Sequence, residues 1–296
     1  MRMTGTFLDA VVADIPSNNW GPEEWAADFD AMKAVGIDTV ILIRTGWRDH
    51  TCFDSPALRK HYKLLPAYDD LLALFLDEAA RCGMDFWFGG FDSVTWRRQS
   101  THQREIEANI ALADEVIARL DAHPAFRGWY LTHEIPSFQE GAVQLYERLA
   151  RHLKGLKNLP TLISPWLQEG LSVDDHETTW REVFSRIGGL VDICAFQDGM
   201  CSFTDLPAYL QVNTRLCREY GLRCWGNVET FERGDVPLRF MPIDWRHLRY
   251  KIEAASAAGC EKLITFEFSH FLSPNSMYPS ARTLYNRYRR WLEAQG

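Results

Sequence analysis

Short apolar runs alternate with amphipathic segments along the whole chain. The apolar runs are rich in β-branched and aromatic residues and are bounded by polar turns, which is typical of buried strands. They predict strands over Gly5–Val12, Thr39–Thr45, Asp85–Asp92, Gly128–Glu134, Thr161–Trp166, Val191–Asp198, Arg223–Glu229 and Lys262–Phe268. A strand followed by a helix, repeated eight times, predicts an α/β fold with parallel strands. We expect a single (β/α)8 TIM barrel over residues 1–296.

The segments between the strands have helical spacing. Their apolar stripes include Trp25, Phe29, Met32 and Val35 in one segment and Trp245, Leu248, Ile252 and Ala255 in another. Each stripe is predicted to pack against the barrel. A glycine ends several of these segments just before the next strand, where a left-handed residue suits the turn, at Gly36, Gly83, Gly221 and Gly259. The longest insertion is expected after the second strand, over residues 46–68.

The charge balance argues against some classes of partner. The chain carries 32 Lys and Arg against 40 Asp and Glu, which gives a net charge of −8. Nucleic-acid binding needs a basic surface, so we expect no nucleic-acid partner. No run reaches the roughly 18 apolar residues of a membrane span, and the first residues lack the pattern of a signal peptide. We therefore expect a soluble protein with no membrane partner.

The chain has seven cysteines, which is an odd number, and none forms a CxxC pair. Several lie within apolar strand or helix patterns. This usage is typical of reduced core residues and not of a disulfide framework or a zinc site. It predicts a cytoplasmic protein, or a secreted one if a signal peptide has been removed.

Carboxylates recur at the predicted ends of the strands. In a TIM barrel the active site lies at the carboxyl ends of the strands. Glu134, Glu229 and Glu267 all lie there within apolar runs. A carboxylate in such a place is costly unless it is hydrogen-bonded or functional. A structural hydrogen bond would explain any one of these carboxylates alone, but three of them at one rim favour an active site.

Glycoside hydrolysis needs two carboxyl groups on either side of the scissile bond. Strands four and seven stand on opposite sides of a barrel mouth, so Glu134 and Glu229 are the predicted pair. This placement resembles the large clan of retaining barrel glycosidases, which implies Glu134 as acid/base and Glu229 as nucleophile. Retention predicts carboxyl groups about 5–5.5 Å apart. His133 stands where that clan usually has Asn.

A closer resemblance covers nearly the whole chain. Four segments carry it, namely Gly5-Thr6-Phe7, the Gly-Trp-Tyr-Leu-x-x-Glu of residues 128–134, Gln197-Asp198-Gly199, and Asn227-Val228-Glu229-Thr230-Phe231 with Thr265-Phe266-Glu267-Phe268-Ser269-His270. Together they resemble an uncharacterised bacterial family, domain of unknown function 4434, provisionally described as glycosyl hydrolases. The resemblance implies a barrel hydrolase and no particular substrate.

Other polar groups at the same rim are candidates for binding a carbohydrate, either an oligosaccharide or a glycoside. They are Gln197, Asp198, Asn227, Glu267, His270, Asp92 and Arg44. Asp198 also fits a turn that closes strand six, Glu267 and His270 fit a structural network, and Arg44 and Asp92 fit an ion pair across the rim.

The 11 tryptophans are an unusual excess. Flat rings stack on the apolar faces of sugars, and Trp47, Trp96 and Trp166 follow predicted strands where such a platform would lie. Helix packing is the more ordinary explanation for Trp20, Trp25, Trp180 and Trp245.

Two other functions fit the same pattern. A metal-dependent sugar isomerase or epimerase would gather Glu134, Asp198, Glu229, Glu267 or His270 around a divalent cation. The chain has no HxH or HExxH motif, so we expect no metal and no cofactor. A non-catalytic carbohydrate-binding barrel would keep the tryptophans but has no need of several buried acids. The sequence does not predict the oligomeric state.

Overall fold

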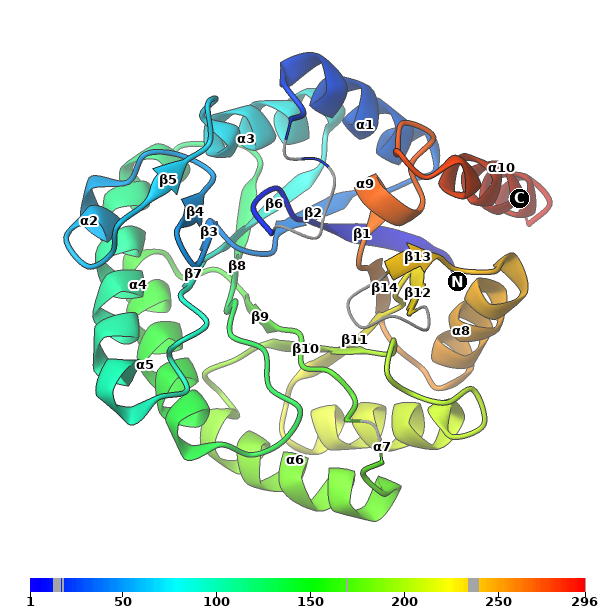
Figure 1. Cartoon of the computed structure of the whole chain (residues 1–296). Coiled ribbons are helices and arrows are strands. Elements are labelled where there is room, and N and C mark those ends of the chain that lie inside the picture. Colours follow the sequence, from blue (N-terminus) through cyan, green and yellow to red (C-terminus); the bar gives the residue numbers. More distant parts are fainter. Residues whose placement is uncertain (13–16, 18, 169, 234–239, 296) are drawn as a thin grey trace.

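The protein is described by a computed structural model that covers residues 1–12, 17, 19–168, 170–233 and 240–295. Eight parallel strands close into a barrel in the order β1-β14-β11-β10-β9-β8-β6-β2 (Figure 1). Their bounds are β1 Met3–Leu8, β2 Thr39–Leu42, β6 Asp85–Gly89, β8 Phe126–Tyr130, β9 Thr161–Ile163, β10 Ile193–Gln197, β11 Arg223–Asn227 and β14 Lys262–Thr265. The predicted α/β class and TIM-barrel architecture are confirmed.

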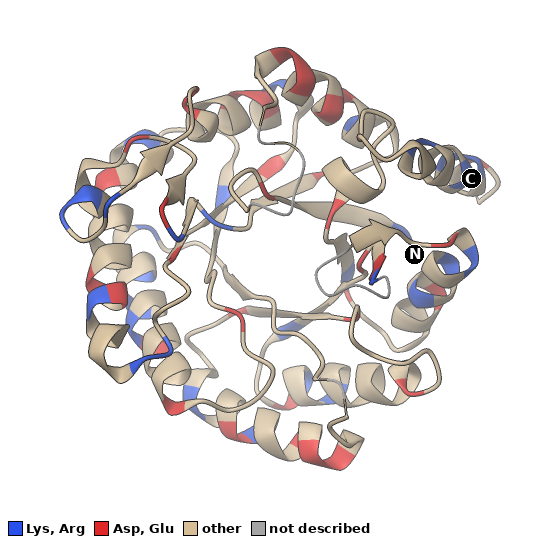
Figure 2. Cartoon of the chain, in the orientation of Figure 1, with Lys and Arg blue, Asp and Glu red and all other residues tan. Residues whose placement is uncertain are grey.

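Helices surround the barrel (Figure 1). The long ones are α1 Pro22–Ala34, α3 Leu71–Cys82, α4 Gln99–Leu120, α5 Glu140–Leu156, α6 Val173–Ile187, α7 Leu206–Glu219, α8 Trp245–Ala257 and α10 Pro279–Glu293; α2 Pro56–Arg59 and α9 Phe268–Phe271 are short. The predicted stripes are buried, although Trp245 is only partly so. Lys and Arg alternate with Asp and Glu on these helices (Figure 2).

The four predicted glycines follow or cap their helices with a positive φ. Gly83 has φ +70° and is the C-cap of α3, while Gly36, Gly221 and Gly259 have φ between +74° and +85°. This is the left-handed region that residues with a side chain rarely adopt, so the prediction is confirmed.

The barrel strands end earlier than predicted. β8 stops at Tyr130 and β11 at Asn227, so Glu134 and Glu229 both lie in loops beyond their strands. The hydrophobic pattern continues past the paired strands because the loops that follow them are buried against one another. For example, Thr132 in the loop after β8 donates a hydrogen bond to the carbonyl of Ile43 in the loop after β2. Burial, and not strand pairing, produces the apolar run there.

The predicted insertion contributes three of the four strands of a small sheet, and the fourth strand, β7, follows β6 (Figure 1). Its order is β5-β4-β3-β7, from β3 Gly46–Trp47, β4 His50–Thr51, β5 Leu65–Pro66 and β7 Phe91–Asp92. A second ribbon pairs β12 Phe231–Arg233 with β13 Phe240–Pro242. These two additions place Trp47 on one side of the barrel mouth and Phe231 on the other.

Inside the barrel, a compact apolar layer supports the mouth. It includes Phe7, Trp87, Tyr130, Trp225 and Ile264, all nearly or fully buried. Gly128 is necessary for this layer, because a side chain there would lie 2.3 Å from the Trp87 ring. The barrel is therefore filled, and ligands have access only at its ends.

All seven cysteines are free, and six of them are buried, as the sequence predicted for core residues. Among the helices that the structure describes, none is long and apolar enough to cross a membrane.

Candidate active site

A pocket opens at the carboxyl ends of the barrel strands. Its lining includes six of the predicted site residues, Arg44, Trp47, Glu134, Gln197, Asn227 and Glu229. Gln197 and Asn227 are the last residues of β10 and β11, Arg44, Glu134 and Glu229 lie in the loops after β2, β8 and β11, and Trp47 lies in β3. These segments are distant in sequence and meet because the barrel is closed. The cavity volume is about 180 Å³. This is below the roughly 300–1,000 Å³ typical of drug-sized ligands, so the pocket suits a small ligand.

Glu134 is partly buried and is surrounded by groups that favour its ionised form. The Tyr130 hydroxyl donates a hydrogen bond of 2.9 Å to Oε1. Burial raises the pKa of Glu134, and the Arg44 guanidinium and hydrogen bonds from Gln197 and Tyr130 oppose that rise. A carboxyl group with a cation and two donors beside it is well suited to carry a negative charge.

Glu229 has a different set of charged neighbours. Its side chain is buried, and burial together with the charge of Asp198 raises the pKa of Glu229 to about 8. The Lys251 and Arg233 charges oppose this rise only in part. A methyl group added at Gly199 would lie 1.5 Å from Glu229 Oε2, so the carboxyl group occupies the space beside that glycine. Glu229 is therefore the protonated member of the pair near neutral pH.

Asp198 lies behind Glu229 and outside the residues that line the pocket. Its Oδ1 accepts a hydrogen bond of 3.0 Å from the Glu229 backbone N–H and one of 2.8 Å from Lys251 Nζ. Lys251 Nζ also donates to the Glu229 carbonyl at 3.3 Å. These contacts hold the Glu229 backbone in place. The sequence allowed either a contact with sugar hydroxyls or a turn that closes strand six for Asp198, and Asp198 does not line the pocket. Lys251 was missed because it lies in the middle of α8.

Asn227 and Arg44 each present a buried polar atom to the pocket region. Asn227 Nδ2 donates to the Ser164 hydroxyl at 3.2 Å, whereas its Oδ1 has no hydrogen-bond partner among the described residues. Arg44 Nε is likewise unpartnered there. Buried polar atoms in a folded protein are nearly always hydrogen-bonded, so these two are available to a ligand.

Arg44 has three acidic neighbours. Its guanidinium lies 4.0 Å from the Asp92 carboxylate, as the predicted ion pair requires, and it also interacts with Asp9 and Glu134. Sequence reasoning missed Asp9, which directly follows β1 and lines the pocket. The signal was present, because an acidic residue at the carboxyl end of an apolar strand is the pattern that identified the glutamates.

Glu267 and His270 lie behind the pocket wall and do not line it. Both are buried, and Glu267 Oε1 lies 2.5 Å from His270 Nδ1. Burial and the nearby carboxyl groups of Asp9 and Asp28 raise the pKa of Glu267 well above its usual range. Glu267 is the N-cap of the short helix α9, so the chain turns away from the mouth there. The structural network that the sequence allowed is the arrangement found.

The tryptophans separate into two groups. Trp47 lines the pocket, while Trp166 is partly buried and lies outside its lining. Trp96 is buried with its ring centroid 5.2 Å from that of His133, so the platform predicted for it is wrong. Trp25 and Trp180 are fully buried against the helices, and Trp20 and Trp245 are partly buried, as packing predicted.

One wall of the pocket is made of phenylalanines that the sequence analysis did not single out. They are Phe7, Phe231, Phe240 and Phe266. Their rings are in contact, with centroids 4.5 Å apart for Phe231 and Phe240 and 6.0 Å apart for Phe231 and Phe266. The pocket therefore has one polar side and one apolar side.

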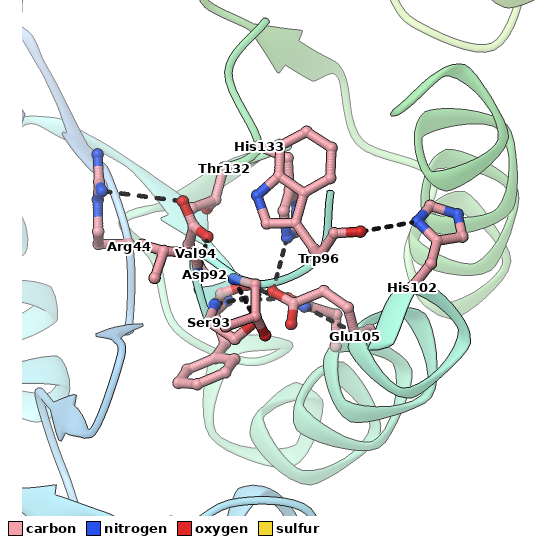
Figure 3. A network of polar contacts seen from close by, with 12 residues as sticks. Arg44, Asp92, Ser93, Val94, Trp96, His102, Glu105, Thr132 and His133 are labelled. Atoms are coloured by element: carbon pink, nitrogen blue, oxygen red, sulfur yellow. Dashed lines mark hydrogen bonds and ion pairs between the residues drawn. The ribbon is translucent and has the colours of Figure 1, made fainter. Parts of the chain in front are cut away.

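A buried polar network lies beside Arg44 (Figure 3). Asp92, Glu105 and His133 form the one group with metal-ligand geometry in the part of the chain that the structure describes. Its carboxylates already have partners: Glu105 Oε1 accepts from His133 Nε2 at 2.9 Å and from the Ser93 N–H at 3.0 Å, and Asp92 Oδ1 accepts from the Val94 N–H at 2.7 Å. These contacts explain the group as structural support for the loop that carries Glu134. The predicted cation set of Glu134, Asp198, Glu229, Glu267 and His270 is not such a group.

The fold is a (β/α)8 barrel with a pocket at the carboxyl ends of its strands. The chain belongs to the family described as domain of unknown function DUF4434, whose model matches residues 3–278. The resemblance seen in the sequence motifs is thereby confirmed. No curated protein matches the chain.

Solved structures add a near relative and several distant ones. The crystal structure of a "putative alpha-L-fucosidase" from Bacteroides thetaiotaomicron VPI-5482 is 43% identical, with a TM-score of 0.93 over 98% of this chain and 95% of that one. An endo-1,4-beta-D-mannanase from Thermotoga petrophila RKU-1 is 11% identical, with a TM-score of 0.64 over 99% of this chain and 100% of that one. A GH18 chitinase from Pseudoalteromonas aurantia is 9% identical, with a TM-score of 0.57 over 99% and 98%. The two distant neighbours are glycoside hydrolases and show the shared fold.

The pKa of Glu229 leads to a prediction about stability. In the unfolded chain Glu229 loses its proton near pH 4.5, whereas in the folded protein it does so near pH 8. Its contribution to stability is therefore fully present below pH 4.5 and is lost as the pH rises to about 8. The free energy of unfolding, measured with urea between pH 5 and 8.5, should fall less steeply for Glu229→Gln than for the wild type.

The matched control is Glu253→Gln, on the exposed side of α8, which should follow the wild type. Equal slopes for the wild type and Glu229→Gln would show that Glu229 titrates normally in the folded protein.

Proposed function

We propose that this protein is a glycoside hydrolase in which Glu134 and Glu229 act on opposite sides of the glycosidic bond of a sugar in the pocket. The observation that carries the proposal is the pair itself: two carboxyl groups line one small pocket, one beside a cation and hydrogen-bond donors and the other beside a carboxylate. Environments that push two carboxyl pKa values apart are the arrangement that acid and base roles require.

The surroundings support a division of roles opposite to the one predicted from strand positions. Glu229, with its pKa near 8, holds the proton and serves as the general acid. Glu134, beside Arg44, Gln197 and Tyr130, serves as the nucleophile. Strand position locates the pair in the loops beyond β8 and β11, and burial together with the neighbouring charges supports our choice of the protonated member.

The proposed reaction has two steps. The Glu134 carboxylate attacks the anomeric carbon, the bond from that carbon to the leaving oxygen breaks, and the Glu229 proton passes to the leaving oxygen. The oxygen of a water molecule then attacks the anomeric carbon, the bond from that carbon to the Glu134 oxygen breaks, and one proton of the water passes to the Glu229 carboxylate, which restores both groups. Two displacements at one carbon give a product with retained configuration.

The phenylalanine wall supports a 6-deoxy sugar as substrate. In such a sugar a methyl group replaces the hydroxymethyl group. When this methyl group packs against the apolar wall, no hydroxyl of the ligand is left there without a hydrogen-bond partner. The fucosidase description of the 43% identical relative points to the same class. We therefore propose a terminal α-L-fucosyl group as the substrate, with Trp47 and the unpartnered Asn227 Oδ1 on the polar side.

A matched pair of substrates tests this choice of sugar. 4-Nitrophenyl α-L-fucoside and α-L-galactoside differ only by the hydroxyl on C6. Since an apolar pocket rejects an added hydroxyl by up to about 100-fold, kcat/KM should be roughly 10–100-fold higher for the fucoside. Equal values, or preference for the galactoside, would contradict the 6-deoxy assignment while leaving the hydrolase proposal standing.

The division of roles is tested by two variants and two leaving groups. Glu229→Ala should slow an alkyl fucoside by about three orders of magnitude and an activated dinitrophenyl fucoside far less in the first step, because a good leaving group needs little protonation. Glu134→Gly should lose activity on both, and added azide should produce a fucosyl azide of inverted configuration. The reverse pattern between the two variants would restore the assignment based on strand positions.

A further inference from the structure

A second cavity lies next to the pocket. Its volume is about 740 Å³, and it lies between the loop after β9 and the loop after β10, with the beginning of α7 at its side. Gln168 and Leu171 line it from the first loop, and Met200 and Ser202 line it from the second. We call this cavity the groove.

The groove adjoins the pocket at the carboxyl group of Glu229. Arg233 lines both cavities. Gly199 lines the groove, and Glu229 Oε2 lies directly against it, since a methyl group added there would be 1.5 Å away. Glu134 lines only the pocket. The proton that we assign to Glu229 is therefore held at the junction of the two cavities.

The loops that form the groove are held in place by hydrogen bonds. The Tyr209 hydroxyl donates to the carbonyl of Leu171, which ties the first loop to α7. The Ser202 hydroxyl donates to Asp205 Oδ2 at 2.7 Å and accepts from the Asp205 N–H at 3.1 Å, which fixes the second loop to the start of the same helix. Leu171 and Met200 add apolar surface among polar groups. Such a mixture suits sugar rings, which have apolar faces and hydroxyl edges.

We propose that the groove binds the leaving group of the reaction and that this leaving group is a saccharide. This inference rests on the proposed function and adds to it the place and class of the leaving group. A general acid must reach the oxygen between the sugar and the leaving group, and Glu229 lies at the corresponding junction. The pocket holds one small ligand, so the protein removes a single terminal sugar from an oligosaccharide.

The test compares a substrate that uses the groove with one that does not. A fucosylated trisaccharide places a disaccharide in the groove, whereas α-L-fucosyl fluoride leaves the groove empty. Its leaving group, the fluoride ion, departs without protonation. Gln168→Trp fills the groove from an exposed position of the first loop. This variant should lower kcat/KM for the trisaccharide about tenfold or more. Its kcat/KM for fucosyl fluoride should stay within about twofold of the wild-type value.

Met200→Trp, from the opposite loop, should reproduce this split, and Gln211→Trp, exposed on α7, should change neither value. A thermal melt of each variant verifies folding. Equal losses on both substrates, or no loss on the trisaccharide, would overturn the groove assignment. If the wild-type protein hydrolyses neither substrate, the proposed function itself fails.

Discussion

The ion pair between Lys251 and Asp198 is the interaction on which the site depends. Both side chains are buried, and Lys251 Nζ lies 2.8 Å from Asp198 Oδ1. Removing one partner of a buried pair usually costs about 3–5 kcal/mol, because an uncompensated charge remains. The pair also fixes the loop after β11, since Asp198 accepts from the Glu229 N–H and Lys251 donates to the Glu229 carbonyl. Burial raises the pKa of the Glu229 side chain, and the same carboxylate that positions the Glu229 backbone adds to that rise.

The opposite side of the mouth has the complementary arrangement. Arg44 is surrounded by Asp9, Asp92 and Glu134, so a single cation serves three carboxyl groups. Behind it, the His133–Glu105 contact supports the loop that carries Glu134. Glu134 thus has a cation beside it, whereas Glu229 has a carboxylate behind it. A hydrolase with two carboxyl groups needs this asymmetry, because one group must donate a proton while the other attacks.

The architecture and six of the residues that line the pocket were predictable from local patterns. Periodicity defines eight strand and helix units, and barrel geometry then brings Arg44, Glu134, Gln197, Asn227 and Glu229 to one end. What the sequence could not supply are contacts between distant elements. Lys251 appears only as one position on a helix, and its partnership with Asp198 follows from the packing of α8 on the barrel. The turn of the chain at α9, which keeps Glu267 and His270 out of the pocket lining, depends on the same kind of long-range packing. The division of roles that we propose rests on the same kind of contact, because a pKa depends on neighbours in space.

The proposed role of Glu134 as nucleophile can be tested by trapping the covalent intermediate and locating it by mass spectrometry. 2-Deoxy-2-fluoro-α-L-fucosyl fluoride has a reactive leaving group, and its fluorine at C2 slows breakdown of the ester formed with the nucleophile. After incubation and digestion, the account predicts one fluorofucosyl group, attached to the peptide that contains Glu134. A label on Glu229 would contradict the assignment of roles. Release of fluoride with a product of inverted configuration and no labelled peptide would contradict the covalent mechanism.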